Sequence, residues 1–393
     1  MLAATQEQAG SVWEVLRVAT RLGLTSFGGP IAHLGYFREE YVNRRKWLDE
    51  KTYADLVALC QFLPGPASSQ VGIAIGLLRA GLPGAIASWV GFTLPSVLAL
   101  VLFAYAVPAG NMETSGWLKG LMIVAVAVVA QAVWGMAKTL APDRIRKTMV
   151  LLAAIAALSF PVAGVQVGII VMAGLLGWWL LPRVAPPDTL SLSVGLGRRA
   201  ALLCWGLFFG LLLLLPLLAQ GGGLWLPLID GFYRAGSLVF GGGHVVLPLL
   251  QAVVVPAGWM DAPTFLAGYG AAQAVPGPLF TFAAYLGMMT AGWGGAVVAI
   301  LAIFLPSFLL VIGVLPFWDA IRRRPAFQAA FAGINAAVVG ILLAALFDPI
   351  FIKAIVSPLD FCLALLAFGL LMIWKLPPWL VVLVAAVGGW IIG

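Results

Sequence analysis

Long apolar stretches, each about as long as a membrane-spanning helix, follow one another along most of this chain. A transmembrane helix needs about 20 mainly apolar residues. Stretches near that length run at 83–107, 117–138, 162–182, 199–219, 294–317, 326–347, 360–375 and 378–392. The shorter segment 148–160 is expected to form a hairpin with 162–182. This pattern predicts an all-α polytopic membrane protein.

Composition leads to the same class. Hydrophobic residues make up 62% of the chain and charged residues 9%, with a mean hydropathy of +1.06. Since a soluble domain with so few charges could not cover its surface, a soluble enzyme, a nucleic-acid-binding module and a disulfide-stapled secreted domain are excluded. The N-terminal residues Met1–Gly10 are polar and lack an apolar core, so no cleavable signal peptide is expected.

Residue patterns typical of metal sites and catalytic sites do not occur. Cys60, Cys204 and Cys362 are widely separated and stand beside no histidine. No HExxH, HxxxH, DxxD or GxSxG motif is found, and acidic residues are nearly absent from the predicted spans. We therefore expect no metal ion, no cofactor and no enzymatic activity.

A second set of apolar segments is too short to span a bilayer, and glycine or proline interrupts it. These segments are 11–27, 31–42, 53–63 and 67–81 in the first half, and 224–240, 244–256, 264–275 and 278–292 in the second. The interruptions are Gly28-Gly29-Pro30, Pro64-Gly65-Pro66, Gly241-Gly242-Gly243 and Pro276-Gly277-Pro278. Broken helices free backbone groups that only protein or a water-filled cavity can satisfy. Such segments at matching places in two halves indicate a transporter's binding site.

The two halves match in sequence. SFGGP at 26–30 corresponds to VFGGG at 239–243, CQFLPGP at 60–66 to AQAVPGP at 272–278, and LPS at 94–96 to LPS at 305–307. The separation stays between 211 and 213 residues throughout, which predicts an internal duplication at about 11–140 and 224–350. We accordingly divide the chain into a first repeat (1–140), connecting transmembrane helices (141–223), a second repeat (224–350) and C-terminal transmembrane helices (351–393).

Loop charge predicts that the two repeats cross the membrane in opposite directions. Lysine and arginine collect in cytoplasmic loops, which accounts for the formal net charge of +7. The loop at 38–51 carries five basic residues, whereas its counterpart around 256–263 carries none. The basic clusters at 138–147 and 322–324 also fit the cytoplasm. The sequence therefore predicts inverted-topology repeats with broken, re-entrant helix hairpins.

The FGG and PGP motifs of both halves are expected to meet near the membrane midplane and to line a cavity. Free N–H groups at the start of a helix, together with its dipole, bind anions. The alternative is that these motifs are only tight turns and packing contacts. The candidate substrate-binding residues of the motifs are Gly28, Gly29, Pro64, Gly65, Pro66, Ser68, Ser69, Gly241, Gly242, Pro276, Gly277 and Pro278, with Gln61 and Gln273 three residues before each PGP.

Charged and titratable residues stand close to the same motifs. Arg21 and Arg234 precede the two FGG motifs at equal spacing and are expected to attract an anion. Asp230 stands one turn before Arg234 and could pair with it, so the alternative role is an internal salt bridge. His33 and His244 follow the motifs; with Asp230 they are candidates for proton coupling, and His244 is also a candidate ligand. Helix capping or packing is the alternative for both histidines.

Four segments resemble the chromate ion transporter family, in its two-domain, long-chain type. They are SFGGPIAHLGYFREEYV at 26–42, WLDEKTYADLVALCQFLPGPASSQ at 47–70, LVFGGGHVVLPLLQ at 238–251 and AAQAVPGPLFTFAAYLG at 271–287. The resemblance implies a secondary active transporter that exports the chromate dianion across the cell inner (cytoplasmic) membrane, coupled to the proton motive force, and confers chromate resistance.

Several alternatives stay open at this point. Sulfate is the structural analogue of chromate, so the partner is chromate, sulfate or another oxyanion, together with the lipid bilayer and with no nucleic acid. A passive anion channel is a second option, because a ring of donors also forms a filter. The oligomeric state is not determined by the sequence, and a homodimer is one arrangement it allows.

Overall fold

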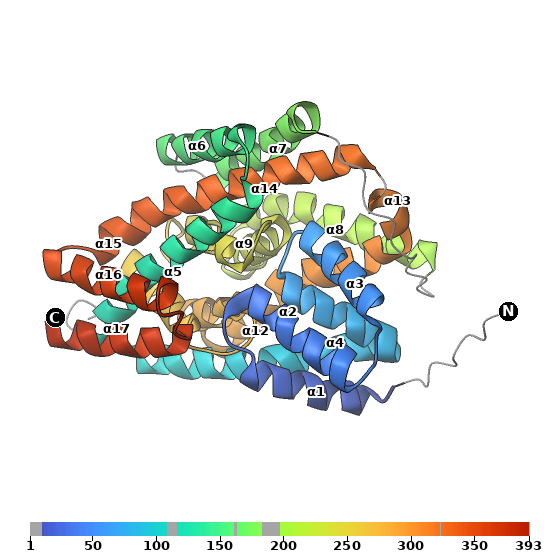
Figure 1. Cartoon of the computed structure of the whole chain (residues 1–393), viewed down its shortest axis with the longest axis horizontal. Coiled ribbons are helices and arrows are strands. Elements are labelled where there is room, and N and C mark those ends of the chain that lie inside the picture. Colours follow the sequence, from blue (N-terminus) through green and yellow to red (C-terminus); the bar gives the residue numbers. More distant parts are fainter. Residues whose placement is uncertain (1–9, 108–115, 161–162, 183–196, 323, 393) are drawn as a thin grey trace.

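The computed structural model describes residues 10–107, 116–160, 163–182, 197–322 and 324–392, and its regular elements over these ranges are helices (Figure 1). The N-terminal segment before Gly10 and Arg323, on which two of the interpretations above rest, lie outside the described residues. Within them, five helices are long and apolar enough to cross a membrane. They are α4 (Ala67–Ala106), α5 (Gly116–Leu140), α8 (Arg198–Leu218), α12 (Phe282–Val314) and α14 (Pro325–Ala345). The predicted all-α, multi-pass membrane class is confirmed.

The remaining helices are shorter, as expected for segments that glycine and proline interrupt. In the first half they are α1 (Val12–Thr25), α2 (Gly29–Phe37), which continues as a π-helical turn (Arg38–Arg44), α3 (Glu50–Phe62), α6 (Arg144–Ser159) and α7 (Ala163–Leu180). In the second they are α9 (Trp225–Leu238), α10 (Val246–Val254), α11 (Ala262–Ala272), α13 (Trp318–Arg322), α15 (Ile352–Ala354), α16 (Pro358–Met372) and α17 (Pro378–Ile392).

Equivalent aspartates start α3 and α11. Asp49 caps α3 by accepting the backbone N–H of Thr52, and Asp261 caps α11 by accepting the N–H of Thr264. The bond from the Thr52 N–H also lowers the pKa of Asp49. These caps explain why KWLD at 46–49 matches GWMD at 258–261 in sequence, because an N-cap needs a short side chain with an acceptor oxygen.

Helices α4 and α12 each contain a sharp reversal at the same place. In α4 the backbone leaves helical geometry at Ala80 (φ −145°, ψ 27°) and Gly81 (φ 64°, ψ −159°). In α12 it does so at Ala291 (φ −146°, ψ 27°) and Gly292 (φ 62°, ψ −152°). The positive φ of the second residue requires glycine. The near-identical angles show that the two halves build this turn in the same way.

Glycine contacts show that each of these helices folds back on itself. A Cβ on Gly76 would lie 2.3 Å from the carbonyl oxygen of Gly84, and one on Gly287 would lie 2.2 Å from that of Gly295. Residues eight apart in a straight helix would be about 12 Å apart along the axis. The short first arms of α4 and α12 therefore run back against the longer second arms as helical hairpins.

The two halves exchange their last helical hairpins. Helices α6 and α7 pack on α14 of the second half, and α16 and α17 pack on α5 of the first (Figure 1). Equivalent glycines make both interfaces: Gly177 lies against Gly333, and Gly389 lies against Gly120. Small residues at such interfaces let helix backbones approach closely in a membrane. Each half thus completes the helix packing of the other, while their opposite orientation and the repeat boundaries stay predictions from sequence.

Replacing Gly120 with alanine is expected to destabilise the protein, because the added Cβ would lie 2.0 Å from the carbonyl oxygen of Ala385 in α17. Overpacking of this kind costs about 1–3 kcal/mol. Gly135, also in α5, is the matched control, since nothing lies within 4 Å of its Cβ position. Thermal unfolding in detergent should show a lower midpoint for Gly120→Ala only. Equal midpoints for the two variants would contradict the exchanged packing.

Candidate functional site

Backbone hydrogen bonds join the PGP turn of each half to the FGG region of the other. The N–H of Gly65 donates to the carbonyl of Val239 at 2.7 Å, and the N–H of Gly277 donates to the carbonyl of Ser26 at 2.9 Å. Ser26 and Val239 each stand two residues before the first glycine of an FGG motif. Such a reciprocal exchange is what a two-fold relation between the halves produces. We call this meeting of the four motifs the crossing.

The crossing requires glycine at the centre of each PGP turn. Gly65 has a φ of +121° and Gly277 a φ of +97°, values that side chains rarely allow. A Cβ on Gly65 would lie 3.0 Å from the Ser307 hydroxyl, and one on Gly277 would lie 2.8 Å from the Ser96 hydroxyl. Ser96 and Ser307 are the serines of the two LPS triplets. The three repeated motifs therefore converge at one place.

The N–H groups of Gly65 and Gly277 in the PGP turns donate to protein carbonyls. The free N–H groups that the sequence predicts belong instead to the starts of the helices at these motifs. Two helices begin at these motifs without a side-chain capping bond. They are α2, whose N-cap Gly28 has a φ of +98°, and α4, whose N-cap is Pro66. Because the first N–H groups of a helix have no intrahelical partner, open backbone donors stand at the first FGG motif and after the first PGP motif.

The two PGP turns differ in exposure. Pro64, Gly65 and Pro66 are buried, whereas Pro276 and Gly277 are half-buried. Gly28, next to the Gly277 turn through Ser26, is exposed. The more exposed side of the crossing is therefore the one on which the second PGP turn meets the first FGG motif.

Several buried polar side-chain atoms near the crossing have no hydrogen-bond partner among the described residues. They are Ser26 Oγ, His33 Nε2, Ser69 Oγ, Gln70 Oε1, Trp89 Nε1, Thr93 Oγ1, Gln273 Nε2 and Ser307 Oγ. Buried polar groups are normally paired. Most of these atoms belong to hydroxyl, amide and ring N–H groups that can donate, so their gathering favours a polar ligand that accepts hydrogen bonds.

The two histidines join helices near the crossing. Nδ1 of His33 lies 3.3 Å from the Ser68 hydroxyl, with its ring edge against Phe92. Nδ1 of His244 lies 2.7 Å from the Tyr269 hydroxyl. His33 therefore ties α2 to α4, and His244 ties the second FGG motif to α11. These contacts favour a positioning role, and proton coupling by either histidine stays a proposal.

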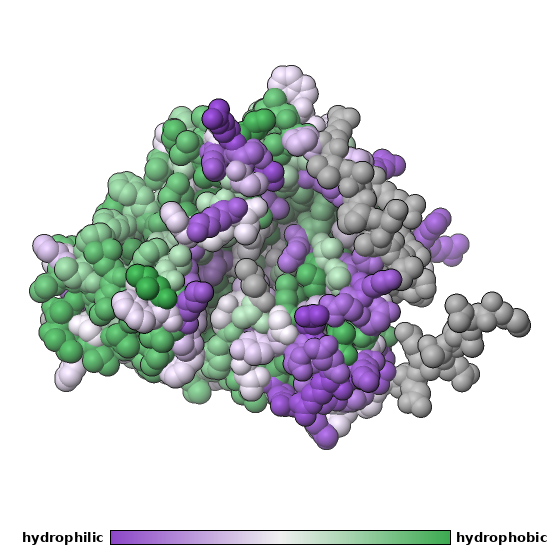
Figure 2. Space-filling view, viewed as in Figure 1, coloured by the Kyte–Doolittle hydropathy of each residue, from purple (hydrophilic) through white to green (hydrophobic). Residues whose placement is uncertain are grey.

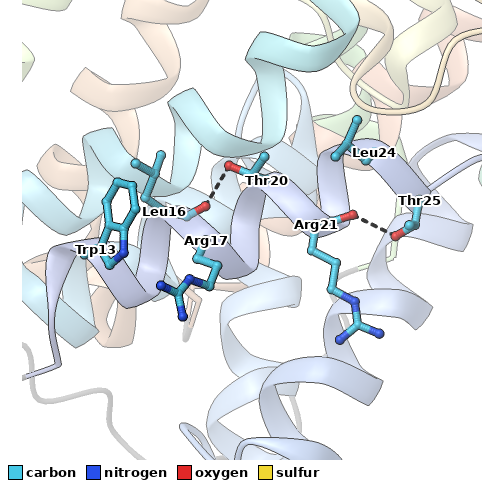
Figure 3. Close-up of a pocket in the computed structure, with 7 residues that line it drawn as sticks. All are labelled: Trp13, Leu16, Arg17, Thr20, Arg21, Leu24 and Thr25. Carbon is cyan, nitrogen blue, oxygen red and sulfur yellow. Dashed lines mark hydrogen bonds between the residues drawn. The ribbon is translucent and has the colours of Figure 1, made fainter.

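The two arginines predicted to attract an anion differ in their surroundings. Arg234 pairs with the buried Asp230 one turn earlier in α9, as their spacing predicted. Arg21 is exposed on the outer face of α1 (Figure 3). Among the described residues, neither arginine has a hydrogen bond or ion pair with a residue of the crossing. Gln61, unlike its counterpart Gln273, is exposed.

The α16–α17 hairpin reaches the first FGG motif through an aromatic contact. The Trp379 ring at the start of α17 lies 6.4 Å from the Phe27 ring. The exposed Lys375 stands four residues before Trp379, in the turn between α16 and α17. Local sequence gives no sign of the hairpin exchange that makes this contact. Sequence reasoning also missed Ser26, Thr93 and Ser307. The repeated LPS triplets could have indicated Ser307.

Comparison with known proteins adds independent evidence. The sequence matches the chromate transporter family over residues 13–178 and 226–390. It is 27% identical over 381 residues to the chromate transport protein of Pseudomonas aeruginosa, covering 95% of this chain and 90% of that one. It is 29% identical to the chromate transport protein of Cupriavidus metallidurans, covering 83% and 79% of the two chains. An uncharacterized transporter of Methanocaldococcus jannaschii is 29% identical, covering 82% and 81%. No solved structure matches.

The two matched stretches hold all the motifs of the crossing, one set in each. They also include the exchanged hairpins α6–α7 and α16–α17. The match covers most of the chain and agrees with the multi-pass helical fold. This chain belongs to the chromate transporter family.

Proposed function

We propose that this protein is a secondary active transporter that exports chromate across the cytoplasmic membrane, coupled to the proton motive force. The observation that carries the proposal is the set of unpartnered buried donors beside the uncapped start of α2 at the crossing. Membership of the chromate transporter family and the relatives named chromate transport proteins supply the substrate class.

A tetrahedral dianion suits these donors. Its four oxygens accept hydrogen bonds in several directions, and a helix start adds the positive end of its dipole. Hydroxyl and amide donors at the crossing come from Ser26, Thr93 and Gln273. Lys375 stands four residues before Trp379, which contacts Phe27, and its charge is proposed to draw an anion toward the first FGG motif.

The two sides of the crossing are proposed to open in turn. In the described conformation the Gly277 turn is half-buried and the Gly65 turn is buried. In the alternate state the roles would exchange, with the Gly65 turn exposed and the Gly277 turn buried.

The membrane potential favours export. An inside-negative potential of 100 mV is worth roughly 2.3 kcal/mol per charge. Two negative charges leaving the cell would therefore gain about 5 kcal/mol. Proton exchange would add to this drive, with His33, His244 and Asp230 as proposed carriers because each lies within about three helical turns of an FGG motif.

Purified protein in liposomes tests the transport step. Vesicles loaded with chromate or with sulfate should release chromate faster when the interior is negative, and faster again with an imposed pH gradient. Dependence on the potential alone would instead indicate a uniporter or a channel. Preference for sulfate would change the substrate, and absence of flux for both anions would contradict the proposal. Protein-free vesicles are the control.

Gln273→Leu is expected to raise the KM for chromate about tenfold or more, because a hydrogen bond to a charged group contributes about 1.5–3 kcal/mol. Its Nε2 is buried and meets no hydrogen-bond geometry among the described residues, although the Gln273 side chain lies near the Tyr269 hydroxyl. Gln251→Leu, a change at another half-buried glutamine on α10, is the matched control. Initial rates of chromate flux at several concentrations measure the effect, and a KM unchanged by Gln273→Leu would remove this residue from the site.

Variants of the Asp230–Arg234 pair test whether Arg234 attracts the anion or only stabilises the fold. Arg234→Gln leaves the buried Asp230 carboxylate without its partner, at a cost on the order of 2 kcal/mol, so folded yield and transport should both fall. The double variant Asp230→Asn with Arg234→Gln should recover the folded yield. If Arg234 attracts chromate, the double variant stays several-fold slower in flux. Wild-type flux in the double variant would show that Arg234 only neutralises Asp230.

A further inference from the structure

We propose that the outer face of α1 binds an anionic phospholipid of the cytoplasmic leaflet. The lipid phosphate would lie between Arg17 and Arg21, and its acyl chain along the neighbouring apolar side chains. This inference is independent of the transported substrate. It gives Arg21 a partner other than the transported anion.

The two arginines share one hollow on the protein surface. The hollow has a volume of about 430 Å³ and is lined by Trp13, Leu16, Arg17, Thr20, Arg21, Leu24 and Thr25. Figure 3 shows both guanidinium groups extending from the same side of α1. Both arginines are exposed, and Trp13 and Leu24 beside them are 63% and 56% exposed. Two charges therefore lie among apolar groups that face outward.

Neither arginine is neutralised by an ion pair among the described residues, although acidic groups lie close by. Glu40 is held by Arg45 at 2.7 Å and by Arg44 at 3.3 Å. Burial alone would raise the pKa of Glu40, but the bond from Arg45 and the charges of Arg45, Arg44 and Arg21 together hold it below its ordinary value. Arg21 thus acts on Glu40 only at a distance.

The other nearby groups leave the same charges uncompensated. Glu14 binds Arg45 and Arg79 at 3.3 Å and 3.5 Å. The guanidinium of Arg17 lies 6.0 Å from the centre of the Trp13 ring, a contact that leaves its charge in place. The positive charges of Arg17 and Arg21 at the hollow are therefore not neutralised by an ion pair among the described residues.

The second half shows that helix packing does not require two arginines here. The positions equivalent to Arg17 and Arg21 are Asp230 and Arg234, which form an internal ion pair. The same face of the helix is thus neutral in one half and doubly positive in the other. The exposed pair of charges is therefore particular to the first half, since Arg17 and Arg21 are exposed whereas Asp230 is buried.

Charge and apolar lining together select the ligand. A free dianion gains nothing from Trp13 and Leu24, whereas a phospholipid supplies both a phosphate and hydrocarbon. The ion pair between Glu14 and Arg45 ties the start of α1 to the basic loop at 38–51, which is assigned to the cytoplasm by its charge. Hydrophilic residues gather at the same end of the molecule (Figure 2). Anionic lipids are concentrated in the cytoplasmic leaflet.

Binding can be measured on the purified full-length protein in a neutral detergent. The probes are dioctanoylphosphatidylglycerol, dioctanoylphosphatidylcholine and inorganic phosphate, each titrated while the thermal unfolding midpoint is followed. The midpoint should rise with the phosphatidylglycerol and stay unchanged with the other two. An equal rise with phosphatidylcholine or with phosphate alone would overturn the proposal, because the first needs no arginine and the second needs no lipid.

Variants locate the site. Arg17→Asp recreates the ion pair of the second half and should therefore fold. It should raise the apparent Kd for phosphatidylglycerol by more than the roughly tenfold increase expected for Arg17→Gln. Arg144→Gln, which removes an exposed charge from α6, is the matched control and should bind as the wild type does. Should Arg17→Asp fold poorly, Arg17→Gln decides the question. Unchanged binding in the Arg17 variants, or equal weakening in Arg144→Gln, would overturn the proposal.

Discussion

The fold depends on two backbone hydrogen bonds, from Gly65 to Val239 and from Gly277 to Ser26. A helix that breaks inside a membrane leaves N–H and C=O groups that hydrocarbon cannot satisfy. Here each half satisfies the broken helix of the other, so the breaks are tolerated only in the assembled chain. The same bonds hold the PGP turns against Ser96 and Ser307, where even a methyl group would collide.

The exchanged hairpins extend this mutual dependence to the outside of the molecule. Helices α5 and α14 carry glycines that are covered by a hairpin from the opposite half. Packing at the periphery and hydrogen bonding at the centre therefore obey the same two-fold relation.

Much of this architecture could be predicted from sequence, because apolar runs, glycine and proline breaks and repeated motifs are local signals. The Asp230–Arg234 pair followed from helical spacing, and the caps at Asp49 and Asp261 underlie a sequence match. The rest depends on contacts between distant segments. The hydrogen bond from the Gly65 N–H to Val239 and the contact between Trp379 and Phe27 are set by which half packs on which. The exposed position of Arg21 also could not be predicted, because its spacing to the FGG motif says nothing about which way it faces; its role in attracting an anion stays a prediction.

The hairpin exchange also affects the order in which the helices can pack during synthesis. Helix α14 is synthesised after α6 and α7, so its partner hairpin is already in the membrane when it arrives. Helix α5 has the opposite history, because α16 and α17 come some 240 residues later. At about 5–20 residues per second, the glycine-lined face of α5 stays uncovered for roughly ten seconds or more. During that interval the first half is a half-built unit whose exposed face other membrane helices, or a chaperone of the insertion machinery, can reach.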